Sequence, residues 1–170
     1  AHNFLWRYQK VVPSRGEVVV FNRSHYEDVL AVKVHPEYME QLPSELSVAQ
    51  NKKFWQERYE DINAFERHLA RSGIVVLKFF LHISKDEQKN RLLERLTIED
   101  KYWKVSPADL KERQFWDDYT GAYEDLLSVT GHEHAPWIVV PANDKKIARA
   151  IVAQVIADAI NGLDIDFPKL

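Results

Sequence analysis

Cysteine is absent from the 170 residues of this sequence, and glycine occurs only five times. Without cysteine, the chain can form no disulfide and no Cys-ligated zinc site, and it cannot use a thiol nucleophile. None of the glycines lies in a G-x-x-x-x-G-K arrangement, so the sequence contains no phosphate-binding P-loop. No apolar run reaches membrane-spanning length, and no cleavable leader pattern occurs. These absences favour a cytoplasmic protein with no membrane partner.

A strong excess of charge of one sign is also lacking. The formal net charge is -3, with 29% charged residues. A surface that binds an anion must therefore arise from local groups of Lys and Arg, and a protein that coats nucleic acid is not expected. Hydrophobic residues make up 45% of the chain, which is enough for the core of a single compact domain.

The pattern of apolar residues predicts an α/β fold with a parallel sheet, because strands alternate with helices along the chain. Apolar runs rich in β-branched residues predict three strands, at residues 17–21, 74–83 and 137–140. Capping residues predict the starts of five helices, at Ser24, Ser47, Ser84, Ser106 and Asn143. We expect the first of these helices to run to about Glu40, the second to end near Gly73, and residues 97–105 to form a mobile connection.

The start of the chain suggests that something precedes it. The sequence begins without methionine and inside a helical pattern, and three strands are few for a doubly wound domain. Such domains usually carry their first strand and its phosphate-binding turn at the N-terminus. We therefore expect an N-terminal segment with that strand and turn to be missing from this chain.

Polar residues follow the first predicted strand directly, where open α/β sheets hold their ligands. They are Asn22, Arg23 and Ser24, with Glu27 one turn further on. Arg23 can direct a planar, permanently charged fork at phosphate oxygens, and the helix start after Ser24 offers N–H donors. The local pattern alone is explained at least as well by a helix cap with a surface arginine paired to Glu27 or Asp28.

Two further arginines, Arg91 and Arg95, are four residues apart on a predicted helix and so share a face, with Lys104 close behind. Two guanidinium groups on one face can converge on a polyanion, as phosphoryl transfer requires. The alternative is a solvated face on which Glu94 and Asp100 are the partners. Taken alone, such charge patterns are usually solvated faces.

Two other segments give weaker signals. Arg113 lies beside an aromatic stripe that is typical of a core helix but also fits a lid. Asn143, Asp144 and Lys145 follow the last predicted strand, where nucleotide kinases hold the base, although the same residues form ordinary strand-to-helix turns. The pair of histidines in the H-E-H stretch at 132–134 fits a solvated turn better than a metal site.

Taken together and in order, the segments of this chain resemble the polyphosphate kinase 2 family. The matching stretches are FLWRYQK (4–10), FNRSHYEDVL (21–30), KFFLHISKDEQ (78–88), RLLERL (91–96), YWKVS (102–106), WDDYTGAY (116–123) and PANDKK (141–146). They span nearly the whole chain and are specific as an ordered set. The resemblance implies a three-layer, thymidylate-kinase-like P-loop fold with a helical lid. It also implies transfer of phosphate between inorganic polyphosphate and ADP/ATP or AMP, with Mg²⁺, in a homo-oligomer.

The same resemblance implies roles for single residues. Asn22, Arg23 and Ser24 fall at the Walker B position, and Glu27 falls near the acceptor nucleotide. Arg91 and Arg95 resemble phosphate-binding arginines that, with Arg23, stabilise charge in catalysis. They lead into a lid at about residues 96–114, with Lys104 and Arg113 as further lid contacts. Asn143, Asp144 and Lys145 would border the base site.

Two departures from the family pattern affect these expectations. The Walker A segment is absent, so we expect the 170-residue chain to be inactive by itself. Position 22 is Asn where many members carry Asp, which removes a charge that binds magnesium and hints at use of AMP as well as ADP. We therefore expect no metal ligand from this chain, with Mg²⁺ held mainly by substrate phosphates. Two alternatives stay open: a non-catalytic α/β module that binds polyanions or assembles with partners, and an ATP-dependent nucleoside monophosphate kinase.

Overall fold

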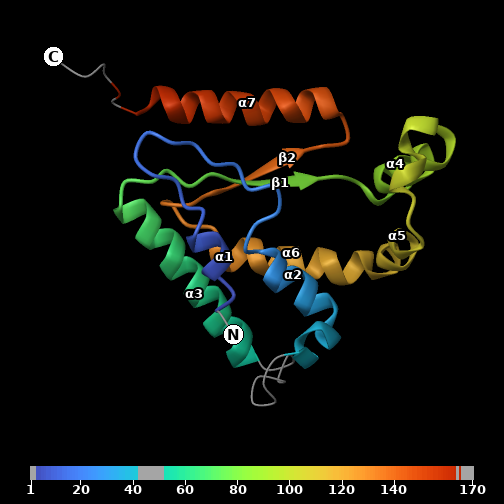
Figure 1. Cartoon of the computed structure of the whole chain (residues 1–170), viewed down its shortest axis with the longest axis horizontal. Coiled ribbons are helices and arrows are strands. Elements are labelled where there is room, and N and C mark those ends of the chain that lie inside the picture. The colour runs from blue at the N-terminus through green and yellow to red at the C-terminus, as the bar shows by residue number, and fades with distance from the viewer. Residues whose placement is uncertain (1–2, 42–51, 164, 166–170) are drawn as a thin grey trace.

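The computed structural model describes residues 3–41, 52–163 and 165. Its elements form layers around a small sheet (Figure 1). Helix α7 (Lys145–Asn161) covers one face of the sheet, and helices α2 (Glu27–Val34), α3 (Lys52–Arg71) and α6 (Trp116–Thr130) lie on the other side. The start of α3 predicted at Ser47 falls outside the described residues, whereas its predicted end near Gly73 is confirmed.

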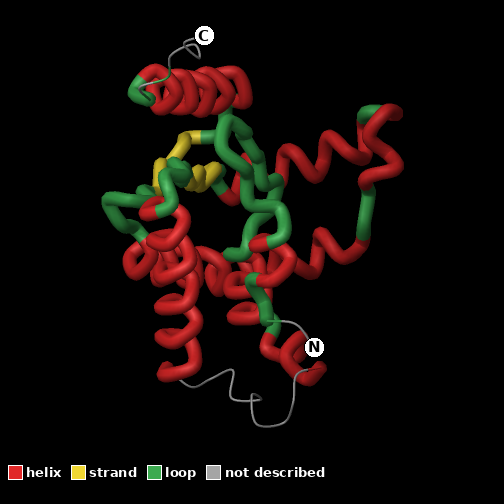
Figure 2. The backbone as a smooth tube through the Cα atoms, turned by 60° about the vertical axis from the view of Figure 1, so that its left-hand side comes forward, coloured by secondary structure: helices red, strands yellow, loops and turns green. Residues whose placement is uncertain are grey.

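The sheet contains two parallel strands, β1 (Lys78–His82) and β2 (Trp137–Pro141). Lys78 pairs with Trp137 and His82 with Pro141 at the two ends of the ladder. The prediction of a parallel α/β fold is therefore confirmed, although β1 is shorter than residues 74–83. Figure 2 shows the two short strands in yellow, with a helix above them and loops beside them.

The prediction of a strand at residues 17–21 is wrong. These residues form no strand, and Val18 and Val20 are 75% and 80% exposed. β-Branched composition favours an extended backbone, but a strand also needs a neighbour whose backbone completes its hydrogen bonds. In the described part of the chain, Glu17 N–H donates to the Ser14 carbonyl at 3.1 Å, as in a turn, and no ladder of backbone hydrogen bonds pairs this segment with another strand.

The N-terminal helices are shorter than predicted. Helix α1 spans Trp6–Gln9, and α2 begins at Glu27 without a side-chain cap, because the carbonyl of Ser24 accepts the N–H of Glu27. Helix α2 ends at Val34, not near Glu40, since Pro36 disfavours a helical residue before it. The chain continues as a 3₁₀ helix, η1 (Pro36–Gln41).

Capping in the C-terminal half largely follows the sequence. The Ser84 hydroxyl accepts the N–H of Glu87 at the start of α4 (Lys85–Thr97), and Ser106 caps α5 (Pro107–Glu112), with Pro at its first position. The expected mobile connection at 97–105 is instead a 3₁₀ helix, η3 (Glu99–Lys104). A further 3₁₀ turn, η4 (Arg113–Phe115), separates α5 from α6.

Helix α7 is capped one residue later than predicted. Asp144, not Asn143, accepts two backbone N–H groups of its first turn, because the Asn143 side chain is used elsewhere. A carboxylate at this position also complements the positive end of the helix dipole.

Two groups of buried side chains form the core. The larger lies among α2, α3 and α6, where Val29, Ile62 and Leu126 are fully buried. The smaller lies where α7 covers β2 and includes Val140 and Ala148. Among the described residues, no helix is long and apolar enough to cross a membrane. The core thus holds the elements that position the two polar loops described next.

Candidate functional site

The turn at residues 22–24 holds Arg23 in a left-handed backbone conformation, with φ of 72°. This conformation is costly for a residue with a side chain and persists only where the surroundings enforce it. The Arg23 side chain is 78% exposed, and its Nε lies 3.3 Å from Glu27 Oε1. An exposed pair of this kind contributes little to stability, so the guanidinium is available to an anionic ligand. The pairing itself matches the simpler alternative drawn from the sequence.

Beneath this turn lies a buried group of four side chains, the Glu66 cluster, made of His25, Tyr26, Glu66 and Lys78. Glu66 is fully buried, and Lys78 is 6% exposed. Lys78 Nζ donates to Glu66 Oε2 at 2.6 Å, to the Tyr26 hydroxyl at 3.0 Å and to the carbonyl of Thr130 at 2.7 Å. The Tyr26 hydroxyl donates to Glu66 Oε1 at 2.6 Å, and His25 Nε2 lies 3.1 Å from the same oxygen.

The cluster keeps Glu66 ionised although it is buried. Burial raises the pKa of a carboxyl group, but the hydrogen bond from His25 and the charge and hydrogen bond of Lys78 outweigh it, so the pKa of Glu66 is lowered. Burial lowers the pKa of Lys78, and Glu66 opposes that shift. Burial and the neighbouring carboxylate of Glu66 both raise the pKa of Tyr26, which therefore stays a neutral donor.

A second polar arrangement, the α4 clasp, joins the start of α4 to the loop after β2. Asn143 Oδ1 accepts the backbone N–H of Ser84 at 2.9 Å, and its Nδ2 donates to the Ser84 hydroxyl at 3.3 Å. Arg91 donates to the carbonyls of Ala142 and Asn143, and its Nε donates to Glu87 Oε1 at 2.7 Å. The carboxyl ends of the two strands are thereby fixed to each other.

The segment from α4 to α5 projects beside the sheet (Figure 1), and arginines hold it together. Arg95 Nη1 donates to Asp109 Oδ2 at 2.5 Å and to the carbonyl of Lys104 at 3.3 Å. Arg113 Nη1 donates to the carbonyl of Lys85 at 2.7 Å and to Gln88 Oε1 at 2.8 Å. The Arg95 and Arg113 contacts therefore fasten η3, α5 and η4 to α4.

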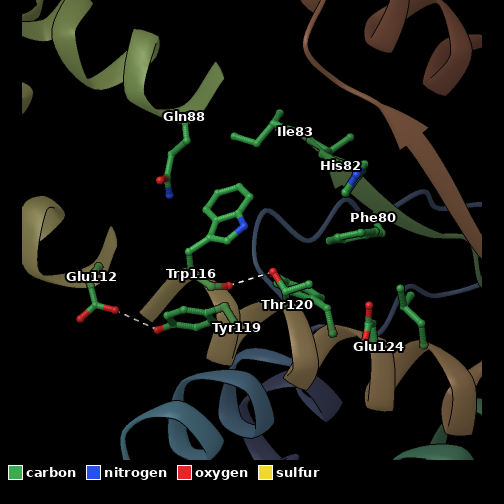
Figure 3. Close-up of a pocket in the computed structure, with 12 residues that line it drawn as sticks. Phe80, His82, Ile83, Gln88, Glu112, Trp116, Tyr119, Thr120 and Glu124 are labelled. Carbon is green, nitrogen blue, oxygen red and sulfur yellow. Dashed lines mark hydrogen bonds between the residues drawn. The ribbon is translucent and has the colours of Figure 1, made fainter. Parts of the chain in front are cut away.

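A cavity of about 470 Å³ lies between the end of β1, the start of α4 and α6. Its wall is mainly aromatic and apolar, and Figure 3 shows the rings of Trp116, Tyr119 and Phe80 along it. Gln88 and Glu112 add polar atoms, and Glu112 accepts the Tyr119 hydroxyl at 3.1 Å. The spacing of the aromatic residues predicted a core helix, and α6 does contribute Ala122 and Leu126 to the core, with Tyr123 packed against it. The aromatic side chains themselves are half-buried, and Trp116 and Tyr119 border this cavity.

The predicted site residues thus fall into separate groups. Asn22, Arg23, Ser24 and Glu27 share the turn before α2. Arg91 and Asn143 meet in the α4 clasp, while Asp144 caps α7 and Lys145 begins it. Arg95, Lys104 and Arg113 lie in the projecting segment. Among the described residues, no hydrogen bond or ion pair joins the turn to the other groups.

Sequence reasoning missed Glu66 and Lys78. Lys78 stands in an apolar strand pattern and Glu66 on a helix, with no local sign that the two meet. A lysine inside a buried strand is the one signal that pointed to a buried partner. Within the described part of the chain, no three His, Asp or Glu side chains lie close enough together to hold a metal ion.

Comparison with known proteins gives consistent matches. A family model described as Polyphosphate kinase 2 matches residues 1–168. The chain is 49% identical to an ADP-polyphosphate phosphotransferase of Rhodopseudomonas palustris, covering 99% of this chain and 58% of that protein. It is 44% identical to an AMP/ADP-polyphosphate phosphotransferase of Meiothermus ruber, covering 99% and 59%. It thus spans less than two thirds of the length of these relatives.

A solved structure agrees with these matches. The crystal structure of polyphosphate kinase 2 from Arthrobacter aurescens superposes with a TM-score of 0.87 at 46% identity, over 100% of this chain and 56% of that one. The crystal structure of putative polyphosphate kinase 2 from Pseudomonas aeruginosa superposes with a TM-score of 0.77 at 36% identity, over 93% of this chain and 31% of that one. A match of the family model over 168 of 170 residues settles the assignment. The chain belongs to the polyphosphate kinase 2 family.

Proposed function

We propose that the protein containing these residues transfers phosphate between inorganic polyphosphate and ADP/ATP or AMP in the cytoplasm. The observation that supports this most directly is the family match over residues 1–168, together with relatives named as ADP- and AMP/ADP-polyphosphate phosphotransferases. The proposed fold is the three-layer thymidylate-kinase-like P-loop type, and the proposed assembly is a homo-oligomer. A phosphate oxygen is already a nucleophile, so the transfer needs no general base from this segment.

In this proposal the turn before α2 faces the reacting phosphates. Arg23 is exposed and pairs with the partly exposed Glu27, so a polyanion can replace that carboxylate at little cost. Its fork stabilises charge that spreads over the transferred group. Asn22 and Ser24 offer further hydrogen bonds, and Glu27 lies toward the nucleotide.

The projecting segment acts as the lid, at about residues 96–114. Arg91 and Arg95 lie at its base, and Lys104 and Arg113 are in its body. The contact of Arg95 with Asp109 is part-buried, and a bound polyphosphate competes with that carboxylate for the guanidinium. Asn143, Asp144 and Lys145 border the base.

Mg²⁺ fits this proposal as an ion held by substrate phosphates. Asn22 is exposed in the same turn as Arg23, and Mg²⁺ keeps several water ligands when phosphates bind it. When bound, the ion neutralises charge on the phosphates. The residues of this chain then bind and orient the chain of phosphates and exclude water from it.

The test is a transfer assay with the product of the native gene, using polyphosphate as donor and ADP or AMP as acceptor. Arg23→Ala should lower kcat/KM by about 10²-fold or more, the usual effect of removing one group that stabilises transition-state charge. Arg149→Ala is the matched control, because Arg149 is an exposed arginine of α7. Transfer from ATP but not from polyphosphate would favour the monophosphate kinase. Transfer to ADP but never to AMP would rule out AMP as an acceptor.

A further inference from the structure

We propose that Glu66 is a positioning residue, whose buried side chain fixes the turn at residues 22–24 by accepting hydrogen bonds from His25 and Tyr26, while Lys78 compensates its charge. The proposal deepens the proposed function, on which its activity readout rests. It assigns a role to the most deeply buried charged pair in the described part of the chain. Glu66 lies outside the motifs that carried the sequence predictions, and Lys78 begins the KFFLHISKDEQ stretch but was given no role there.

The contacts of Glu66 carry the first step. Its Oε1 accepts from the Tyr26 hydroxyl at 2.6 Å and contacts His25 Nε2 at 3.1 Å, while Oε2 accepts from Lys78 at 2.6 Å. Two of its three partners are therefore consecutive residues that directly follow Ser24. A buried carboxylate is costly unless it is paired and hydrogen-bonded. If His25 and Tyr26 moved away, Glu66 would either become exposed to water or stay buried without two of its hydrogen-bond donors.

The backbone of Arg23 carries the second step. Its φ of 72° is strained, and such a residue persists only when its neighbours on both sides are held. On one side the Glu66 cluster holds His25 and Tyr26. After Arg23, the Tyr8 hydroxyl also donates to the carbonyl of Ser24 at 3.0 Å. Before Arg23, the Phe21 ring lies edge-on to the Tyr8 ring, with centroids 5.9 Å apart. The backbone that carries the exposed guanidinium of Arg23 is thus fixed by buried contacts of its neighbours.

A buried ion pair can also be merely structural, so the test must separate stability from positioning. In Glu66→Gln/Lys78→Met, the amide oxygen of Gln still accepts from Tyr26 and His25, whereas both charges are gone. In Glu66→Leu/Lys78→Met, the charges are also gone, but no acceptor is left. Replacing a buried pair by neutral groups of similar volume is often close to neutral for stability. The two double variants therefore differ mainly in whether the turn keeps its anchor.

Two readouts are needed on the native gene product. Hydrogen exchange of the peptide covering residues 21–28 should be about tenfold faster in the Leu/Met variant and close to wild type in the Gln/Met variant. The kcat/KM for transfer should fall on the order of 10-fold to 100-fold in the Leu/Met variant, mainly in kcat, with recovery in the Gln/Met variant. Ile62→Val, on the same helix one turn away, reports the effect of core destabilisation alone.

Equal exchange and equal kcat in the two double variants would overturn the proposal. If the Leu/Met variant does not fold, Tyr26→Phe replaces it, because it removes one hydroxyl and keeps the ring. Wild-type exchange and kcat in Tyr26→Phe would then overturn the proposal as well. Failure of the proposed function is distinguishable, because it removes wild-type transfer from polyphosphate while leaving the exchange comparison intact.

Discussion

Replacing Arg91 with Met removes the hydrogen bonds that Arg91 makes in the α4 clasp and keeps most of the apolar stem. Nη2 of Arg91 donates to the carbonyl of Ala142, a residue that is 5% exposed. A hydrogen bond from a charged group contributes about 1.5–3 kcal/mol, and the lower value applies because the Arg91 side chain is 25% exposed. The helical pair with Glu87 adds about 0.3–0.5 kcal/mol. We therefore expect Arg91→Met to lower the free energy of unfolding by about 2 kcal/mol.

Urea unfolding and thermal melting of the native protein and the variant measure this loss. At the size of this chain, about 2 kcal/mol corresponds to roughly 4–8 °C in melting temperature. Arg149→Met is the matched control, since it removes an exposed helical arginine and should change the free energy by less than about 0.5 kcal/mol. A loss in Arg91→Met no larger than in the control would refute the view that Arg91 ties the loop after β2 to α4.

Three further changes test other parts of the fold. Burial lowers the pKa of His35, but hydrogen bonds to Glu112 and Glu37 outweigh it and raise the pKa overall. The resulting stabilisation is complete below the unfolded-state pKa of about 6.5 and is lost as the pH rises through the folded-state pKa. The melting temperature of wild type should therefore exceed that of His35→Gln by a larger margin at a pH of about 5.5 than at a pH of about 8.5. A pH-independent difference would contradict this. Asp144→Ala should cost about 1 kcal/mol in urea unfolding through the lost α7 cap, and no change would show that the cap is dispensable. Gly73→Ala should lower the free energy of unfolding by about 1–2 kcal/mol through backbone strain alone, because φ is +85° while an added Cβ meets nothing within 4 Å. A neutral result would show that the backbone relaxes.

Local signals predicted much of the fold. Ser84 and Ser106 were identified as caps from the residues that follow them, and both caps are confirmed. The strand at 17–21 was wrong because its valines give an extended preference, whereas strand formation depends on a backbone neighbour that the pattern cannot specify. For the same reason, β1 is confined to the residues that pair with β2.

The candidate site shows where local reasoning ends. The spacing of Arg91 and Arg95 places them on one face of α4, and both side chains are there. Spacing could not indicate that Arg91 contacts a loop 51 residues away or that Arg95 meets Asp109. Their roles toward phosphate stay a prediction. Such partners depend on tertiary packing, which a single sequence does not encode in any short pattern.

The Glu66 cluster also bears on how the protein unfolds. It joins Tyr26 to Lys78 across 52 residues, so its hydrogen bonds require α2, α3 and β1 to be assembled at once. If α2 detached alone, it would leave a buried carboxylate with fewer donors, at a cost close to that of opening the whole core. We therefore expect the slowest amides of α2, α3 and β1 to exchange through one shared opening event. The turn at residues 22–24 and the start of α2, which lie close to the proposed reacting phosphates, would then not unfold locally without the core.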